Sequence, residues 1–131
     1  IKIKQLLPEV LFPKTKHVIR ECARVHQAGE ALQNGNLLVM GKLLQASHES
    51  LRDDFEVSCS ELDFLELQAK STAGVLGARM MGGGFGGCLI GIVKQQESQA
   101  FKDQIQAAYE KTFQLTPEFI EVALGDGARK I

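Results

Sequence analysis

The most constraining feature of the sequence is a glycine cluster. Five of the six residues from Gly82 to Gly87 are glycine, with an arginine–methionine stretch before them and an apolar run after them. Glycine loses more conformational freedom on folding than other residues, at roughly 0.5–1 kcal/mol relative to alanine in a helix or strand. Such a cluster is therefore expected where the backbone needs positive φ, or where side chains would stand in the way of another group.

Three interpretations of this loop are open. A flexible linker is disfavoured, because linkers mix glycine with serine over many residues, whereas this run is short and contains Phe85. A tight hairpin turn without a ligand is the second interpretation. The third is a loop whose N–H groups approach an anion or a substrate. The glycines match neither G-x-G-x-x-G nor G-x-x-x-x-G-K, so their spacing alone does not decide between the last two.

The first two-thirds of the chain has helical periodicity. Between Lys14 and Gln33 apolar or small residues recur at steps of three and four, which predicts a helix with one buried face. Gly35 suits a left-handed C-terminal cap, and Asn36 can cap the start of the next helix. The predicted buried face of the first helix consists of Val18, Cys22, Val25, Gly29 and Leu32.

Two further helices are predicted before Gly74. The second follows Asn36, and the third begins at Ser60, which is expected to be its N-cap. Their apolar faces are Leu37, Met40, Leu44, Ser47 and Leu51 for the second, and Leu62, Leu65 and Ala69 for the third.

After Gly74 the periodicity changes. Strands are predicted on both sides of the glycine loop, from Val75 to Met81 and from Cys88 to Val93. A helix from Glu97 to Phe113 follows, and Pro117 opens a predicted final strand in which Ile120, Val122 and Leu124 alternate with their neighbours. This order predicts one α+β domain over residues 1–131, with two layers in which helices pack on a small, mainly antiparallel sheet.

Composition excludes several classes of function. A length of 131 residues suits one domain, and a net charge of −1 with scattered basic residues gives no footprint for nucleic acid or an anionic membrane. No apolar run reaches the ~18 residues of a membrane-spanning helix. Cys22, Cys59 and Cys88 lie far apart, which indicates free thiols in a reducing compartment. The chain begins with Ile1, and we expect it to be a piece of a longer protein.

The titratable residues form no obvious catalytic set. The three histidines are too dispersed for a metal site; His17 and His26 are expected to be solvated, and His48 either to be structural or to line a cleft. Asp53 and Asp54 are adjacent on a predicted helix and should point in different directions, so a solvated helix end is favoured over a carboxylate pair.

Arg79 lies in an otherwise apolar segment beside the glycine loop. It either forms a structural ion pair, which is the favoured alternative, or directs its guanidinium group at a phosphate. Met80 and Met81 are expected to pack in the core or against the loop.

The segment "GARMMGGGFGGC" resembles the third signature motif of the galactokinases, which belong to the GHMP kinase superfamily. The segments "KHVIRECARVHQAGEALQNGN", "SHESLRDDFEVSCSELDFL" and "GDGARKI" also resemble the C-terminal half of galactokinases, in the same order. The resemblance extends from about Lys16 to Ile131. Met81 departs from the pattern, since threonine is common at that place in the family, and methionine lacks the hydroxyl group that could form a hydrogen bond near the loop.

The resemblance implies a ferredoxin-like GHMP kinase C-terminal domain whose N-terminal partner domain is absent from this chain. It implies transfer of the γ-phosphoryl group of ATP to the C1 hydroxyl of α-D-galactose, with Mg²⁺, in the cytoplasm. The sugar-binding motif, the phosphate loop and the catalytic residues would precede Ile1, so ATP and Mg²⁺ would be bound mainly outside this chain. The chain would then hold no catalytic or metal-binding residue, and would be inactive alone.

The residues that the resemblance does place in the cleft between the two domains are those of the loop. Bare backbone would let sugar and triphosphate meet, whereas side chains would occupy the space they need. Phe85 is expected to turn inward and anchor the loop to the core, and Arg79 to support the loop from behind. The candidate site residues are Gly82, Gly83, Gly84, Phe85, Gly86 and Gly87.

Two alternatives to galactokinase fit the same motif. One is an N-acetylgalactosamine kinase, and the other is a galactokinase-like regulator that binds galactose and ATP without catalysis. Separated from its partner domain, the chain is also expected to expose apolar surface and to self-associate.

Overall fold

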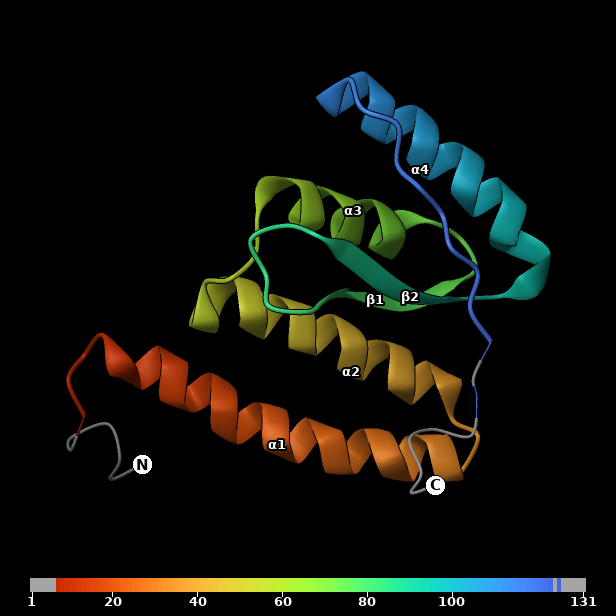
Figure 1. The fold of residues 1–131 in the computed structure, drawn as a ribbon. Coiled ribbons are helices and arrows are strands. Elements are labelled where there is room, and N and C mark those ends of the chain that lie inside the picture. The colour runs from red at the N-terminus through yellow and green to blue at the C-terminus, as the bar shows by residue number, and fades with distance from the viewer. Residues whose placement is uncertain (1–6, 124, 126–131) are drawn as a thin grey trace, which may run out of the picture.

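The structure is a computed structural model that describes residues 7–123 and residue 125. Within this part of the chain, four helices pack against one antiparallel hairpin (Figure 1). Helices α2 and α3 both pack on β1, while α1 lies against α2 and α4 against α3. The elements are α1 (Leu11–Gln33), α2 (Leu37–Ser50), a π-helical turn (Leu51–Phe55), α3 (Ser60–Ser71), β1 (Val75–Met81), β2 (Cys88–Val93), a 3₁₀ turn (Gln95–Glu97) and α4 (Ser98–Phe113).

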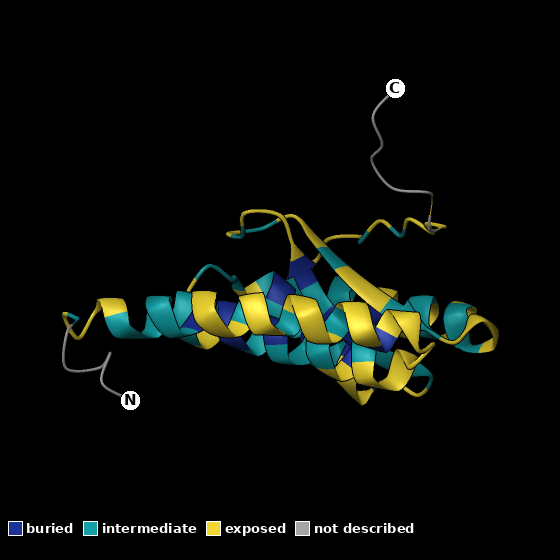
Figure 2. Ribbon diagram, turned by 90° about the horizontal axis from the view of Figure 1, so that it is seen from below, coloured by how far each residue is buried: buried dark blue, intermediate teal, exposed yellow. Residues whose placement is uncertain are grey.

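The predicted α+β architecture is therefore confirmed, with the helices forming one layer and the hairpin the other. Seen from below, the hairpin rises on one side of the helices (Figure 2). Ala78 and Met80 of β1 are buried, whereas Met81 and Ile90 are exposed. The central cluster of the core joins Leu51, Leu62 and Met80, with Phe55, Val57 and Cys59 packed against it.

The boundary between α1 and α2 forms as predicted. Gly35 has a φ of +64°, and the side chain of Asn36 accepts a hydrogen bond of 3.1 Å from the Val39 N–H. The start of α3 is shifted by one residue from the prediction. Cys59 occupies the N-cap position, and Ser60 is the first helical residue, whose hydroxyl donates to Glu61.

The predicted buried face of α1 was wrong. Val18, Val25 and Leu32 are exposed, Val25 to 65%, whereas His17 and Ala31 are buried. The inner face is polar because its groups find partners there: the His17 ring bonds to the Ser50 hydroxyl at 2.9 Å and stacks on Phe55. The expectation that His17 is solvated is therefore corrected. His26 is exposed, as predicted.

The two strands around the loop were predicted with their observed bounds. They pair from Val75 opposite Val93 to Met81 opposite Cys88, with a bulge between Val75 and Gly77. The helix predicted after them also forms, beginning at Ser98, and it buries Ile105.

The predicted final strand does not form among the described residues. The segment from Leu115 to residue 123 has no regular structure, and Ile120 and Val122 are exposed. Alternating apolar residues make a strand only beside a partner strand. This segment instead turns back from the end of α4 (Figure 1). Its Glu121 pairs with Lys102 of α4. Leu124 and all but Gly125 of the closing "GDGARKI" lie outside the described residues.

No helix in the described part of the chain is long and apolar enough to span a membrane. Cys22, Cys59 and Cys88 are free thiols, as predicted.

Candidate functional site

The glycine loop connects the ends of β1 and β2, and its backbone is largely left-handed. Five of its six residues have positive φ: Gly82, Gly84, Phe85, Gly86 and Gly87, between +61° and +139°. This conformation costs an ordinary L-residue roughly 1–2 kcal/mol, and glycine adopts it freely. The cluster is therefore required by the shape of the turn itself, and Phe85 is the one non-glycine residue held in this region.

The loop is anchored to the core by its backbone. The Phe85 N–H donates a hydrogen bond of 2.7 Å to the carbonyl oxygen of Val57. A Cβ on Gly84 would lie 2.2 Å from the same oxygen, so only glycine lets the loop approach so closely. Val57 precedes α3, and it acts through its main chain, which is why no side-chain pattern in the sequence marked it.

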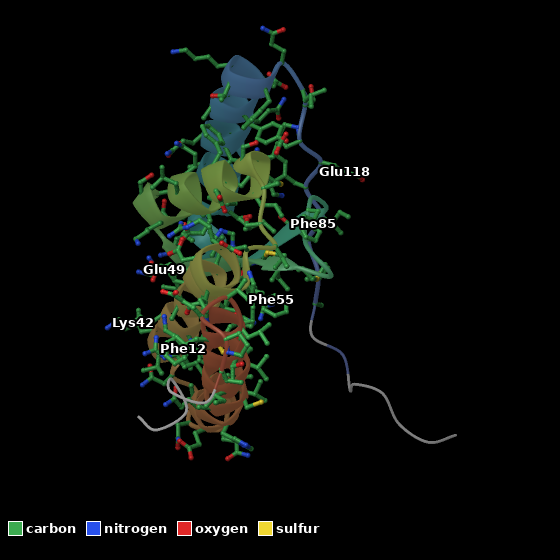
Figure 3. All side chains as sticks on the ribbon, turned by 90° about the vertical axis from the view of Figure 1, so that its left-hand side faces the viewer. Phe12, Lys42, Glu49, Phe55, Phe85 and Glu118 are labelled. Atoms are coloured by element: carbon green, nitrogen blue, oxygen red, sulfur yellow. The ribbon has the colours of Figure 1, made fainter. Side chains whose placement is uncertain are left out.

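The expectation that Phe85 turns inward was wrong. Phe85 is 74% exposed and lies at the end of the hairpin (Figure 3). The backbone hydrogen bond to Val57 already supplies the anchor, so the loop stays fixed while the ring faces outward.

The other four glycines of the loop have free space where a side chain would lie. A Cβ on Gly82, Gly83, Gly86 or Gly87 would meet no heavy atom within 4 Å. The loop thus presents bare backbone to its surroundings at four positions, while Gly84 rests on Val57.

Of the two alternatives predicted for Arg79, the structure shows the structural ion pair. Its Nη1 lies 3.1 Å from a carboxylate oxygen of Glu21 in α1, and its Nε donates to the Met80 carbonyl oxygen at 2.9 Å. Glu21 also accepts from Ser47 at 2.5 Å and from Arg24 at 2.8 Å. Burial raises the pKa of Glu21, but the hydrogen bond from Ser47 and the two guanidinium groups outweigh it and hold that pKa below its usual range.

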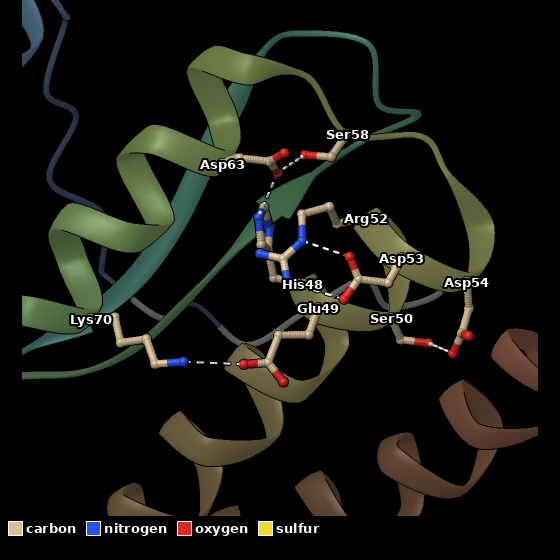
Figure 4. Close-up of polar contacts among 9 residues, drawn as sticks. All are labelled: His48, Glu49, Ser50, Arg52, Asp53, Asp54, Ser58, Asp63 and Lys70. Atoms are coloured by element: carbon tan, nitrogen blue, oxygen red, sulfur yellow. Dashed lines mark hydrogen bonds and ion pairs between the residues drawn. The ribbon is translucent and has the colours of Figure 1, made fainter.

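Of the two predicted alternatives for His48, the structure shows the structural role, and His48 is 0% exposed. Its Nδ1 accepts the Met80 N–H at 3.1 Å, and its Nε2 lies 3.2 Å from Asp63 Oδ1. The Ser58 hydroxyl donates to the same Asp63 oxygen at 2.5 Å (Figure 4). No sequence pattern marked Asp63 and Ser58 as partners of His48, although both lie close to the start of α3.

Asp53 and Asp54 point apart, as predicted. Asp53 pairs with Arg52 at 2.7 Å, whereas Asp54 accepts from Ser50 at 3.2 Å (Figure 4). Asp54 also pairs with Lys16 of α1 at 2.5 Å. No three His, Cys, Asp or Glu side chains of the described residues are grouped so that they could hold a metal ion.

Two shallow hollows lie along α1 and α2, and neither is lined by a loop residue. One has a volume of about 290 Å³ at the α1–α2 turn, near Ala31 and Asn36. The other, of about 280 Å³, has both signs of charge in its lining: Lys16, Arg20, Arg24, Glu49, Asp53 and Asp54, with Ala46 and Ser50. The glycine loop therefore remains the candidate site.

Comparison with known proteins places this loop within a described family. The family "GHMP kinases C terminal" matches residues 28–111. The chain is 43% identical to a galactokinase of Thermotoga neapolitana over 95% of this chain and 36% of that protein. It is 44% identical to a galactokinase of Halalkalibacterium halodurans over 93% of this chain and 31% of that protein.

Two solved structures share the fold. A Lactococcus lactis galactokinase complexed with galactose has a TM-score of 0.80 and 43% identity, covering 83% of this chain and 28% of that chain. An L. major mevalonate kinase in complex with R-mevalonate has a TM-score of 0.71 and 29% identity, covering 86% of this chain and 33% of that one. The chain spans about a third of the length of its curated relatives. The chain belongs to the GHMP kinase family, because its residues 28–111 match the C-terminal region of these enzymes.

Proposed function

We propose that this chain is the C-terminal domain of a galactokinase, which transfers the γ-phosphoryl group of ATP to the C1 hydroxyl of α-D-galactose in the cytoplasm. The observation that carries the proposal is the 43% identity to a galactokinase over 95% of the chain. The mevalonate kinase neighbour shares the fold at only 29% identity, which favours a sugar over mevalonate as substrate. Residues 1–131 would form one domain, with the remainder of the kinase lying outside this chain.

The glycine loop would form one wall of the cleft that holds the two substrates. Phosphoryl transfer depends mainly on positioning and on stabilising the charge of the transferred group. Bare backbone at Gly82, Gly83, Gly86 and Gly87 leaves room for a reactant, and the anchor at Val57 keeps the wall in place. Arg79, held by Glu21, would support the end of β1 from behind the loop.

ATP would supply the phosphoryl group, and Mg²⁺ would neutralise its charge. The open backbone of the loop fits the approach of a phosphate or a sugar. The described residues offer no metal-binding group of three side chains. We therefore propose that Mg²⁺ is held by the nucleotide and by the part of the kinase outside this chain.

The proposal is tested with the full-length kinase. Galactose, N-acetylgalactosamine and mevalonate are supplied separately with ATP and Mg²⁺, and the phosphorylated product is measured. Galactose is expected to give galactose 1-phosphate with the highest kcat/KM. Preference for N-acetylgalactosamine would replace galactokinase with the related kinase, and binding of galactose and ATP without turnover would indicate a regulator. The 131-residue chain alone is expected to give no product.

A further inference from the structure

We propose that His48 is a positioning residue, which holds the glycine loop in its working position through the main chain of Met80. This inference rests on the proposed function of the loop. His48 and Met80 are both 0% exposed, so His48 acts on the loop through its contacts and not by touching a substrate.

The peptide groups of Met80 are held by two side chains. Its N–H donates to His48 Nδ1 at 3.1 Å, and its carbonyl oxygen accepts from Arg79 Nε at 2.9 Å. Met80 lies two residues before Gly82, where the loop begins. The helices thus fix the last part of β1 twice, through His48 of α2 and through Glu21 of α1, which holds Arg79.

A second set of contacts connects His48 to the other end of this segment, at Phe85. Nε2 of His48 contacts Asp63, which also accepts from the Ser58 hydroxyl. Val57 precedes Ser58, and its carbonyl oxygen accepts the Phe85 N–H at 2.7 Å. The residues from Met80 to Phe85 are therefore held at both ends by one connected network, whose centre is His48.

The hydrogen bonds of His48 assign the tautomer of its imidazole ring. A backbone N–H can only donate, so Nδ1 of His48 must carry a lone pair toward Met80. The proton then lies on Nε2, directed at the Asp63 carboxylate. The two ring nitrogens thus have separate roles, since Nδ1 holds the strand that leads into the loop and Nε2 connects it to α3.

These two roles can be separated by substitution. In His48→Asn the amide lies where Nδ1 was, so its oxygen can still accept the Met80 N–H, while the link to Asp63 is lost. In His48→Gln the amide reaches the place of Nε2 and can still donate to Asp63, while the Met80 N–H loses its acceptor. Both variants are made in the full-length kinase. Ile105→Ala serves as the control, since Ile105 is buried in α4 and lies outside the core cluster that contains Met80.

Four quantities are measured for each variant: the melting temperature, kcat, KM for galactose, and amide hydrogen exchange of peptides covering Met80 to Gly87. We expect His48→Asn to keep kcat within about threefold, and His48→Gln to lose about tenfold or more, because small misplacements at a reacting site are costly. Exchange should become faster in His48→Gln alone. Ile105→Ala should lower the melting temperature while leaving kcat per folded molecule unchanged.

The inference is overturned if His48→Gln keeps the kcat and the exchange protection of the wild-type kinase. It is also overturned if the Asn and Gln variants and the Ile105 control all lose activity in proportion to their loss of stability. If the wild-type kinase fails to phosphorylate galactose, the proposed function fails by itself. The exchange measurement then still decides whether His48 holds the loop.

Discussion

The backbones of Gly41 in α2 and Gly77 in β1 are in direct contact. A Cβ on Gly77 would lie 1.9 Å from the Gly41 carbonyl oxygen, and a Cβ on Gly41 would lie 2.0 Å from the Leu76 carbonyl oxygen. His48 follows Gly41 by seven residues, about 10 Å along a helix, and Met80 follows Gly77 by three residues, about 10 Å along a strand. The glycine contact therefore sets the register in which His48 meets Met80.

Substitution of Gly41 should show how much the fold depends on this contact. Gly41→Ala would drive a methyl group into the backbone of β1, and we expect a loss of about 3 kcal/mol or more in the free energy of unfolding. Gly29→Ala is the matched control, because a Cβ there meets nothing within 4 Å, and it should stabilise α1 by about 0.5–1 kcal/mol. Denaturant unfolding measures both, and equal stabilities of the two variants would refute the contact.

A second prediction concerns Glu66, a buried carboxyl in α3. Burial raises the pKa of Glu66 above its ordinary value, although Lys70 and Arg52 oppose the shift. A carboxyl whose pKa is raised on folding contributes stability below its unfolded pKa, and loses that contribution as the pH rises through its folded pKa. Glu66→Gln removes the charged form, so it should raise the melting temperature by a few degrees at about pH 7, with the gain disappearing near about pH 4.

Glu30→Gln on the exposed side of α1 is the control for this measurement, and it should match the wild-type melting temperature at both pH values. If Glu66→Gln instead lowers the melting temperature at about pH 7, the Glu66 carboxylate stabilises the fold, and the prediction is wrong.

Much of the fold could be predicted because its elements are specified locally. The bounds of both strands and the Gly35–Asn36 junction depend on nearby residues, and they form as expected. The inner face of α1 depends on distant partners instead. Glu21 is stabilised by Arg79, which lies 58 residues away in the sequence, and this ion pair lets a polar face point inward while Val18 and Val25 face out.

The candidate site could likewise be predicted only in part. The glycine cluster marked the loop from the sequence, but the contacts that hold the loop involve main-chain atoms of Val57 and Met80. Main-chain hydrogen bonds leave no residue-type signal, so neither could be identified in advance. The final strand is absent from the described residues for a related reason. The alternation after Pro117 is typical of a strand, but a strand forms only beside a partner strand, which the local sequence does not specify.

A third prediction follows from the outward position of Phe85. Phe85→Gly in this chain should change the free energy of unfolding by less than about 1 kcal/mol, because little buried area is lost and the strain of φ +61° is relieved. A phenylalanine that anchored the core would cost about 3–5 kcal/mol on truncation. Denaturant unfolding distinguishes the two cases. Leu62→Ala, which should cost about 2–5 kcal/mol, shows the effect of a core residue in the same experiment.

The last prediction tests whether the loop lines a substrate cleft, and Gly83 offers the cleanest test. Among the six loop residues it alone lacks positive φ, and a Cβ there meets nothing within 4 Å, so a side chain can be added without backbone strain or a clash inside this chain. Gly83→Ala and Gly83→Val in the full-length kinase should stay within about 0.5 kcal/mol of the wild-type stability. Gly84→Val should be less stable, because its side chain would collide with Val57.

If the loop faces the reactants, kcat/KM for galactose should fall with the size of the added group, by about 100-fold for valine, since a displacement of about 1 Å at a reacting centre can cost that much. A loop that serves only the turn leaves this side open to solvent, and it tolerates valine at Gly83 without loss of activity. Stability and steady-state kinetics are measured on the same preparations, so that a loss of folded protein is not mistaken for a loss of catalysis. Wild-type kcat/KM in a stably folded Gly83→Val kinase would remove the loop residues 82–87 from the substrate site and leave the glycines with a structural role alone.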